Sequence, residues 1–144
     1  MDRHGRLGAG RVLGVDLGGR RVGLALTDAG RTFASPLDTI PFVSERKTAE
    51  RLAALCREHG ADLVVVGLPV RDDGTEGENC ARTRRIVDRL LALGVAAVPW
   101  DESWSTRDAA DALKGAGGGR AAVRRNLDRV AAALVLRDWL EHRP

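Results

Sequence analysis

The chain has 144 residues, a hydrophobic content of 44% and a net charge of +3. This length suits one domain that buries roughly 70% of the surface its unfolded chain would expose. No apolar run approaches the ~20 residues of a membrane span, and the basic start is not typical of a signal peptide. Two cysteines, Cys56 and Cys80, are too few for a disulfide scaffold and form no Cys-x-x-Cys pair, so we predict a cytoplasmic protein.

Arginine dominates the basic residues, because Lys47 and Lys114 are the only lysines in the sequence. Arginine binds phosphate through paired hydrogen bonds, which suits a nucleic-acid partner. A GC-rich genome would also favour arginine codons whatever the function, and the small net charge is weak evidence for a polyanionic partner. Aromatic residues make up 3% of the chain, which argues against a base-stacking platform.

The start of the chain is predicted to form a flexible tail over residues 1–10, followed by one domain over 11–144. Three strands are predicted at about 11–17, 22–27 and 32–42. Two prolines, Pro36 and Pro41, interrupt the third strand. Since proline cannot donate to a ladder of hydrogen bonds, this strand is predicted at an edge of the sheet.

Helices and buried strands are predicted for the rest of the chain. An amphipathic helix over about 44–59, capped by Ser44 and ended by Gly60, places its apolar side chains on one face, namely Ala49, Leu52, Ala53 and Cys56. Apolar runs predict buried strands at 63–67 and 95–100. Further helices are predicted up to Gly94, from Ser105 or Thr106 to Lys114, and, after a flexible break at 115–119, over 124–142.

This succession predicts an α/β fold. Three meandering strands followed by two crossover strands form a mixed five-stranded sheet with helices on both faces. Ligands in such sheets gather near the carboxyl ends of the parallel strands. Chemistry-bearing residues at strand ends are therefore the candidates for a functional site.

The segment 12–28 is the most informative part of the sequence. An apolar run reaches Asp16, turns through two glycines followed by Arg20 and Arg21, and resumes as a second apolar run. An ionised carboxylate inside an apolar strand costs several kcal/mol of solvation unless a cation or hydrogen-bond donors compensate it. We interpret Asp16 as a metal ligand, as a partner of the two arginines, or as part of a phosphate site.

Two further carboxylates could join Asp16. Glu102 follows the last predicted strand, and Asp128 shares an apolar face of the last helix with Ala131, Ala132, Val135 and Trp139. Clustered carboxylate oxygens without Cys or His favour Mg²⁺ or Mn²⁺ over zinc. Two such ions can activate a water and stabilise the leaving oxygen of a phosphodiester.

Each of these carboxylates also has a simpler interpretation. Asp128 could stabilise the first turn of its helix by complementing the helix dipole. Glu102 and Asp101 could form a solvated strand end paired with Arg107. Spacing in the sequence leaves both alternatives open.

Four segments, taken together, resemble the YqgF (RuvX) family of resolvase-like nucleases. The first, residues 14–28, reads GVDLGGRRVGLALTD, and the second combines Gly-Leu-Pro at 67–69 with Asp-Gly-Thr-Glu-Gly at 73–77. The third is Asp-Glu-Ser-Trp-Ser-Thr at 101–106, and the fourth is Asp-Arg-Val-Ala-Ala at 128–132. The resemblance covers about residues 11–140 and implies an RNase H-like fold.

The resemblance also implies a site and an activity. Asp16, Glu102 and Asp128 would form the catalytic triad that binds Mg²⁺ or Mn²⁺. The family's activity is nuclease action, attributed to maturing the 5′ end of the 16S ribosomal RNA precursor, with Holliday-junction cleavage as an alternative. Ser103 stands where the family usually has arginine; serine cannot make a bidentate phosphate contact, but Arg107, one helical turn on, could.

Basic residues predicted to hold nucleic-acid phosphates belong to two groups. They are Arg20 and Arg21 in the first turn, and Arg107, Arg124 and Arg125 later in the chain. A solvated, arginine-rich helix start would explain the last two equally well.

Two other functions are alternatives to a nuclease. A non-catalytic nucleic-acid-binding module gains support from Ser103. The segment 16–19 also looks like the phosphate loop of actin-like ATPases and sugar kinases, but the chain is too short for their second domain. The sequence separates neither RNA from DNA nor a monomer from a dimer.

Overall fold

The computed structural model describes residues 10–68, 78–101 and 120–143, with the backbone alone described at 78–79 and 120–127. Its strands are β1 (Arg11–Leu17), β2 (Arg21–Thr27), β3 (Ala34–Pro41), β4 (Ala61–Leu68) and β5 (Ala97–Asp101). Its helices are α1 (Glu45–His59), α2 (Glu78–Ala92) and α4 (Arg120–His142). The predicted tail up to residue 9, the predicted helix ending at Lys114 and the break at 115–119 lie outside the described residues.

The strands form one mixed sheet in the order β3-β2-β1-β4-β5. β1 pairs antiparallel with β2, and β2 pairs antiparallel with β3, which gives the predicted three-strand meander. β4 runs parallel to β1, and β5 runs parallel to β4. The predicted mixed five-stranded sheet is confirmed.

The prolines place β3 where the sequence predicts it, at an edge of the sheet. The ladder between β2 and β3 shifts register, since Leu24 pairs with Asp38 while Ala25 pairs with Pro36. The shift leaves Leu37 as an extra residue in β3. Such a bulge twists an edge strand and weakens its ability to pair with another chain.

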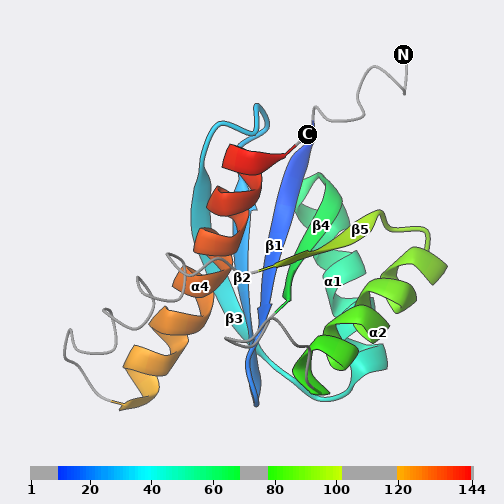
Figure 1. Cartoon of the computed structure of the whole chain (residues 1–144), viewed down its shortest axis with the longest axis vertical. Helices are drawn as coiled ribbons and strands as arrows, with labels where there is room; N and C mark the ends of the chain where they lie inside the picture. The colour runs from blue at the N-terminus through cyan, green and yellow to red at the C-terminus, as the bar shows by residue number, and fades with distance from the viewer. Residues whose placement is uncertain (1–9, 69–77, 102–119, 144) are drawn as a thin grey trace.

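Helices cover both faces of the sheet (Figure 1). α4 lies against β1, β2 and β3 on one face, while α1 and α2 pack together on the other. Alternate residues of β1 feed the two cores: Leu13 and Val15 join the core beneath α1 and α2, whereas Val12 joins the core beneath α4. Side chains on opposite sides of one strand therefore serve opposite helix layers.

The ends of α1 are those the sequence predicts. Ser44 accepts a hydrogen bond from the Lys47 backbone N–H at 3.1 Å, and Gly60 ends the helix in the left-handed region at φ 71°. The predicted apolar face of α1 is buried. None of the helices in the described part of the chain is long and apolar enough to cross a membrane.

The last helix starts earlier than expected, at Arg120 rather than residue 124. The four added residues, Arg-Ala-Ala-Val, include arginine and two alanines, which favour helix once the glycines end. This correction bears on Asp128, which now lies in the interior of a 23-residue helix.

Two glycines allow α4 to approach the sheet closely. A Cβ atom at Gly14 would collide with the Leu136 side chain, and one at Gly23 would collide with the Asp128 carbonyl group. Because Gly23 is the ladder partner of Asp16, the helix crosses the sheet beside that carboxylate at the level of Asp128.

Candidate functional site

Asp16 is the sixth residue of the seven-residue strand β1, near its carboxyl end. It alternates with Val12 and Gly14, which contact α4, so its side chain lies on the α4 face of the sheet. The residue is half-buried rather than fully buried. Its apolar neighbours in the sequence therefore overstate its burial, because the strand ends one residue later.

Asp128 directs its carboxylate toward the turn between β1 and β2. Oδ2 lies 3.5 Å from Nε of Arg21, and a Cβ atom at Gly18 would lie 3.4 Å from Oδ1. The side chain keeps 21% of its surface exposed, so solvent and ligands can reach it. The alternative that Asp128 serves the first turn of its helix is wrong, because α4 begins at Arg120 and has no acidic residue in that turn.

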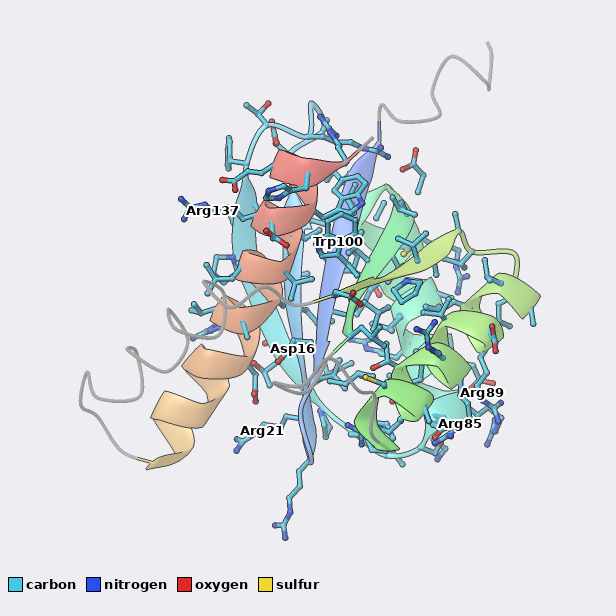
Figure 2. The ribbon with its side chains drawn as sticks, viewed as in Figure 1. Asp16, Arg21, Arg85, Arg89, Trp100 and Arg137 are labelled. Carbon is cyan, nitrogen blue, oxygen red and sulfur yellow. The ribbon has the colours of Figure 1, made fainter. Side chains whose placement is uncertain are left out.

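The fold brings Asp16 and Asp128 to the same end and the same face of the sheet. Figure 2 shows Asp16 beside α4, near the end of the sheet that carries Arg21. Glu102 lies outside the described residues, but the strand before it finishes at the same end of the sheet. Asp101, the last residue of β5, pairs there with Leu68, the last residue of β4. Two of the three predicted carboxylates thus lie at the end of the sheet where the parallel strands finish. The strand that leads to the third carboxylate, Glu102, finishes at the same end.

A cavity of about 250 Å³ opens beside the carboxyl end of β1. Its lining consists of the β1–β2 turn and one carboxylate from α4, namely Gly18, Gly19, Arg20, Arg21 and Asp128. The cavity is open to solvent, and it combines a negative group with two positive ones. This composition suits a site that holds a cation and an anionic ligand together.

The turn itself is held by backbone hydrogen bonds. The Gly18 N–H donates to the Arg21 carbonyl oxygen at 2.8 Å, and the Phe42 N–H donates to the Arg20 carbonyl oxygen at 2.9 Å. Arg20 is exposed and Arg21 is half-buried. Arg107 lies outside the described residues, as do the side chains of Arg124 and Arg125 on α4.

One further arginine meets this turn that sequence reasoning does not predict. Arg82 of α2 donates from Nη2 to the Gly18 carbonyl oxygen at 2.7 Å, and its guanidinium carbon lies 4.7 Å from the centre of the Phe42 ring. No local pattern marks it, because Arg82 sits in an arginine-rich helix 64 residues away from Gly18.

Asp28, the last residue of the first motif, has a structural role instead. The Asp28 carboxylate accepts hydrogen bonds from the backbone N–H groups of Thr32 at 2.7 Å and Phe33 at 3.1 Å. These hydrogen bonds hold the pKa of Asp28 below its ordinary value, and the bond from Phe33 has the largest effect, followed by that from Thr32. Asp28 therefore shapes the β2–β3 connection rather than the cavity.

Another group of potential metal ligands lies toward the C-terminal end of α4. Asp138, Glu141 and His142 place ligand atoms within 4.8 Å of one another. Asp138 already accepts a hydrogen bond from Trp100 Nε1 at 2.8 Å and lies 3.2 Å from His142 Nδ1. The hydrogen bond from Trp100 ties β5 to the helix, about 15 Å along α4 from Asp128.

Comparison with known proteins identifies the family. The model of the family described as "RuvX: Holliday junction resolvase" matches residues 10–142. The chain belongs to the RuvX family. Relatives named "Putative pre-16S rRNA nuclease" include one from Syntrophus aciditrophicus, 37% identical over 91% of this chain and 88% of its own length. Another, from Shewanella oneidensis, is 37% identical over 94% of this chain and 97% of its own length.

Solved structures support the RNase H-like, resolvase-type fold of this RuvX chain. Thermus thermophilus RuvC, solved in complex with a Holliday junction substrate, superposes with a TM-score of 0.53 at 15% identity, covering 87% of this chain and 90% of RuvC. The fowlpox virus resolvase, solved with Holliday junction DNA, gives 0.51 at 13% identity, covering 91% and 97%. At these identities the likeness concerns the fold.

Proposed function

We propose that this RuvX protein is a metal-dependent endonuclease that processes the 5′ end of the 16S ribosomal RNA precursor in the cytoplasm. The observation that carries the proposal is the placement of Asp16 and Asp128 on one face at the carboxyl end of β1, beside an arginine-lined cavity. The names of the curated relatives supply the substrate. A nuclease needs carboxylates that bind metal close to groups that bind phosphate, and both kinds of group lie at this end of the sheet.

The carboxylates fit a hard divalent cation. Asp16 and Asp128 offer oxygen atoms alone, and Mg²⁺ and Mn²⁺ prefer such donors. Glu102 is proposed as the third ligand, since it follows β5, which finishes at the same end of the sheet as β1 and β4. When bound, a pair of such ions would lower the pKa of a water and stabilise the leaving oxygen of a phosphodiester.

The arginines of the turn are proposed to hold the phosphates. Both arginines line the cavity; Arg20 is exposed to solvent, and Arg21 Nε lies 3.5 Å from Asp128 Oδ2. Guanidinium groups bind phosphate oxygens bidentately and keep their charge at every physiological pH. Arg107, Arg124 and Arg125 are proposed to bind further phosphates along the substrate, and Arg107 to supply the bidentate contact that Ser103 cannot make.

Cleavage assays test the proposal. A 16S precursor fragment that carries its 5′ leader is incubated with the protein and Mg²⁺ or Mn²⁺, and the new 5′ end is mapped. We expect cutting with either metal, none in EDTA, and a loss of about 10³-fold or more in Asp16→Asn, because a ligand to the metal is removed. Asp88→Asn, an exposed aspartate on α2, is the matched control and should cut like the parent.

A four-way DNA junction is the second substrate, because the solved structures of similar fold include two bound to Holliday junctions. Cutting of the junction in preference to the RNA precursor would replace the proposed substrate and keep the nuclease chemistry. Binding of either substrate in EDTA without any cutting in metal would contradict the nuclease proposal and favour a binding module. Equal cutting by Asp16→Asn and the parent would refute the assigned site.

A further inference from the structure

We infer that Arg82 of α2 is a positioning residue that fixes the β1–β2 turn and thereby the two arginines that meet the substrate. The inference deepens the proposed function and rests on it for the identity of the substrate. Arg82 does not line the cavity. It acts through Gly18, which does.

The guanidinium of Arg82 is held from two sides. Nη2 donates to the Gly18 carbonyl oxygen at 2.7 Å, a short hydrogen bond from a charged donor. The guanidinium carbon lies 4.7 Å from the centre of the Phe42 ring, within the range of a cation–π contact. Phe42 also donates its backbone N–H to the Arg20 carbonyl oxygen, so the stacking platform is itself bonded to the turn.

These contacts join three separate parts of the fold. Gly18 stands in the turn after β1, Phe42 follows β3, and Arg82 belongs to α2. Because the Gly18 N–H donates to the Arg21 carbonyl oxygen, both hydrogen-bonding groups of Gly18 are engaged, one within the turn and one with α2. A shift of Arg82 would be transmitted directly to Gly18, and from Gly18 to the backbone of Arg21.

The cost of placing Arg82 here indicates a role beyond surface charge. Its Nε atom is buried and has no hydrogen-bond partner among the residues that the structure describes. A buried donor without a partner destabilises a fold, and such groups in native proteins call for an explanation. The planar guanidinium can stack and donate at once, whereas a lysine ammonium at the same position keeps the charge and loses this fixed geometry.

Amide hydrogen exchange, followed by NMR on the full-length protein, tests the positional role. The reporters are the N–H groups of Gly18 and Phe42, and the N–H of Val65 in β4 reports on the whole fold. In Arg82→Lys we expect exchange at Gly18 and Phe42 to accelerate about tenfold relative to Val65, since an ammonium group cannot stack on Phe42 and donate to Gly18 in the same fixed geometry. Arg89→Lys, on the exposed side of the same helix, should leave all three rates unchanged.

Binding of a stem–loop RNA from the 16S precursor, measured by fluorescence anisotropy in EDTA, provides the second measurement. We expect Arg82→Lys to weaken binding about tenfold although the charge is kept, and Phe42→Leu to weaken it in the same direction. The second variant removes the stacking platform without touching the helix, so it replaces Arg82→Lys if that variant fails to fold.

The two measurements separate the possible failures. Unchanged exchange at Gly18 in both variants, or faster exchange with unchanged RNA affinity, would overturn the inference. A parent protein that neither binds nor cuts the RNA refutes the proposed substrate instead, and faster exchange at Gly18 in Arg82→Lys would then still support Arg82 as the anchor of the turn.

Discussion

At the residue scale, Arg21 and Asp128 carry opposite charges and lie 3.5 Å apart beside the cavity. If Asp128 binds a cation, Arg21 repels that cation and attracts phosphate at the same time. The two effects oppose each other in any one assay of activity. They can be separated by measuring metal binding and nucleic-acid binding independently.

We therefore predict that Arg21→Gln changes the two affinities in opposite directions. Loss of a positive charge next to the carboxylate is worth about 1 kcal/mol, so Mn²⁺ should bind about fivefold more tightly in calorimetry. The same variant should bind the stem–loop RNA more weakly, because a phosphate contact is removed. Mn²⁺ affinity equal to that of the parent would show that Asp128 does not hold the metal near Arg21.

A second residue-scale prediction concerns the cysteines, both of which are free and buried. Burial raises the pKa of the Cys56 thiol to about 11. Since the thiolate is the reactive species, native Cys56 should resist alkylation at pH 8 and react readily after unfolding in urea. Mass spectrometry of iodoacetamide-treated protein measures this, and rapid alkylation of the native chain would contradict the burial of α1 against the sheet.

At the scale of elements, α4 and the sheet meet with almost no space between them at Gly23. A methyl group there would collide with the backbone of Asp128. The helix must then move away from the sheet or the strand must bend, and either change displaces the Asp128 carboxylate from Asp16.

We predict that Gly23→Ala lowers the free energy of unfolding by about 1–3 kcal/mol, as overpacking of a core does. Urea denaturation measures the loss, and Mn²⁺ affinity should fall with it. Gly19→Ala is the matched control: a Cβ atom at Gly19 meets nothing within 4 Å, so stability should change by less than about 0.5 kcal/mol. Wild-type stability in Gly23→Ala would contradict the close approach of α4.

The two helices on the other face are linked by Glu45 of α1 and Arg85 of α2. Arg85 donates to the carboxylate at 2.8–3.0 Å, and this bond holds the pKa of Glu45 below its ordinary value of 4.5. A lowered pKa in the folded state means that the ionised form stabilises the fold. The contribution is complete above the ordinary pKa and is lost as the pH falls through the lowered one.

Glu45→Gln should therefore destabilise the protein at pH 7, and this effect should disappear as the pH falls through the lowered pKa of Glu45. Because Arg85 is 46% exposed, the loss at pH 7 should be at most about 1 kcal/mol. Urea unfolding of both proteins across this pH range measures the difference. A loss that persists at low pH would point to packing rather than to the ion pair.

At the scale of the whole molecule, β1, β4 and β5 run parallel, so their carboxyl ends lie at the same end of the sheet. A cation bound there contacts groups that only the folded chain brings together, so it stabilises the native state. We predict that Mn²⁺ at 100 times its Kd stabilises the parent by about 2.7 kcal/mol. Calorimetric unfolding should show a higher Tm in the parent and none of this increase in Asp16→Asn, without any assay of cleavage.

Much of this architecture was predictable because its signals are local. Alternating and continuous apolar runs located the strands, Ser44 and Gly60 located the ends of α1, and the prolines placed β3 at the edge. The sequence predicts the start of α4 four residues late, since no Ser, Thr, Asp or Asn stands between Lys114 and Arg120 to mark a helix start.

The sequence by itself determined the order of the elements and the presence of a carboxylate in an apolar strand. Its prediction of a buried strand at 95–100 is wrong, because β5 lies at the edge of the sheet and leaves Val98 36% exposed. Tertiary structure decided what those residues meet. Asp128 lies close to Gly18 and Arg21 because α4 packs directly against Gly23. Arg82 reaches the β1–β2 turn because α2 packs on the face of the sheet opposite α4. Local periodicity sets secondary structure over a few residues, whereas contacts between distant residues depend on how whole elements pack, which no short pattern encodes.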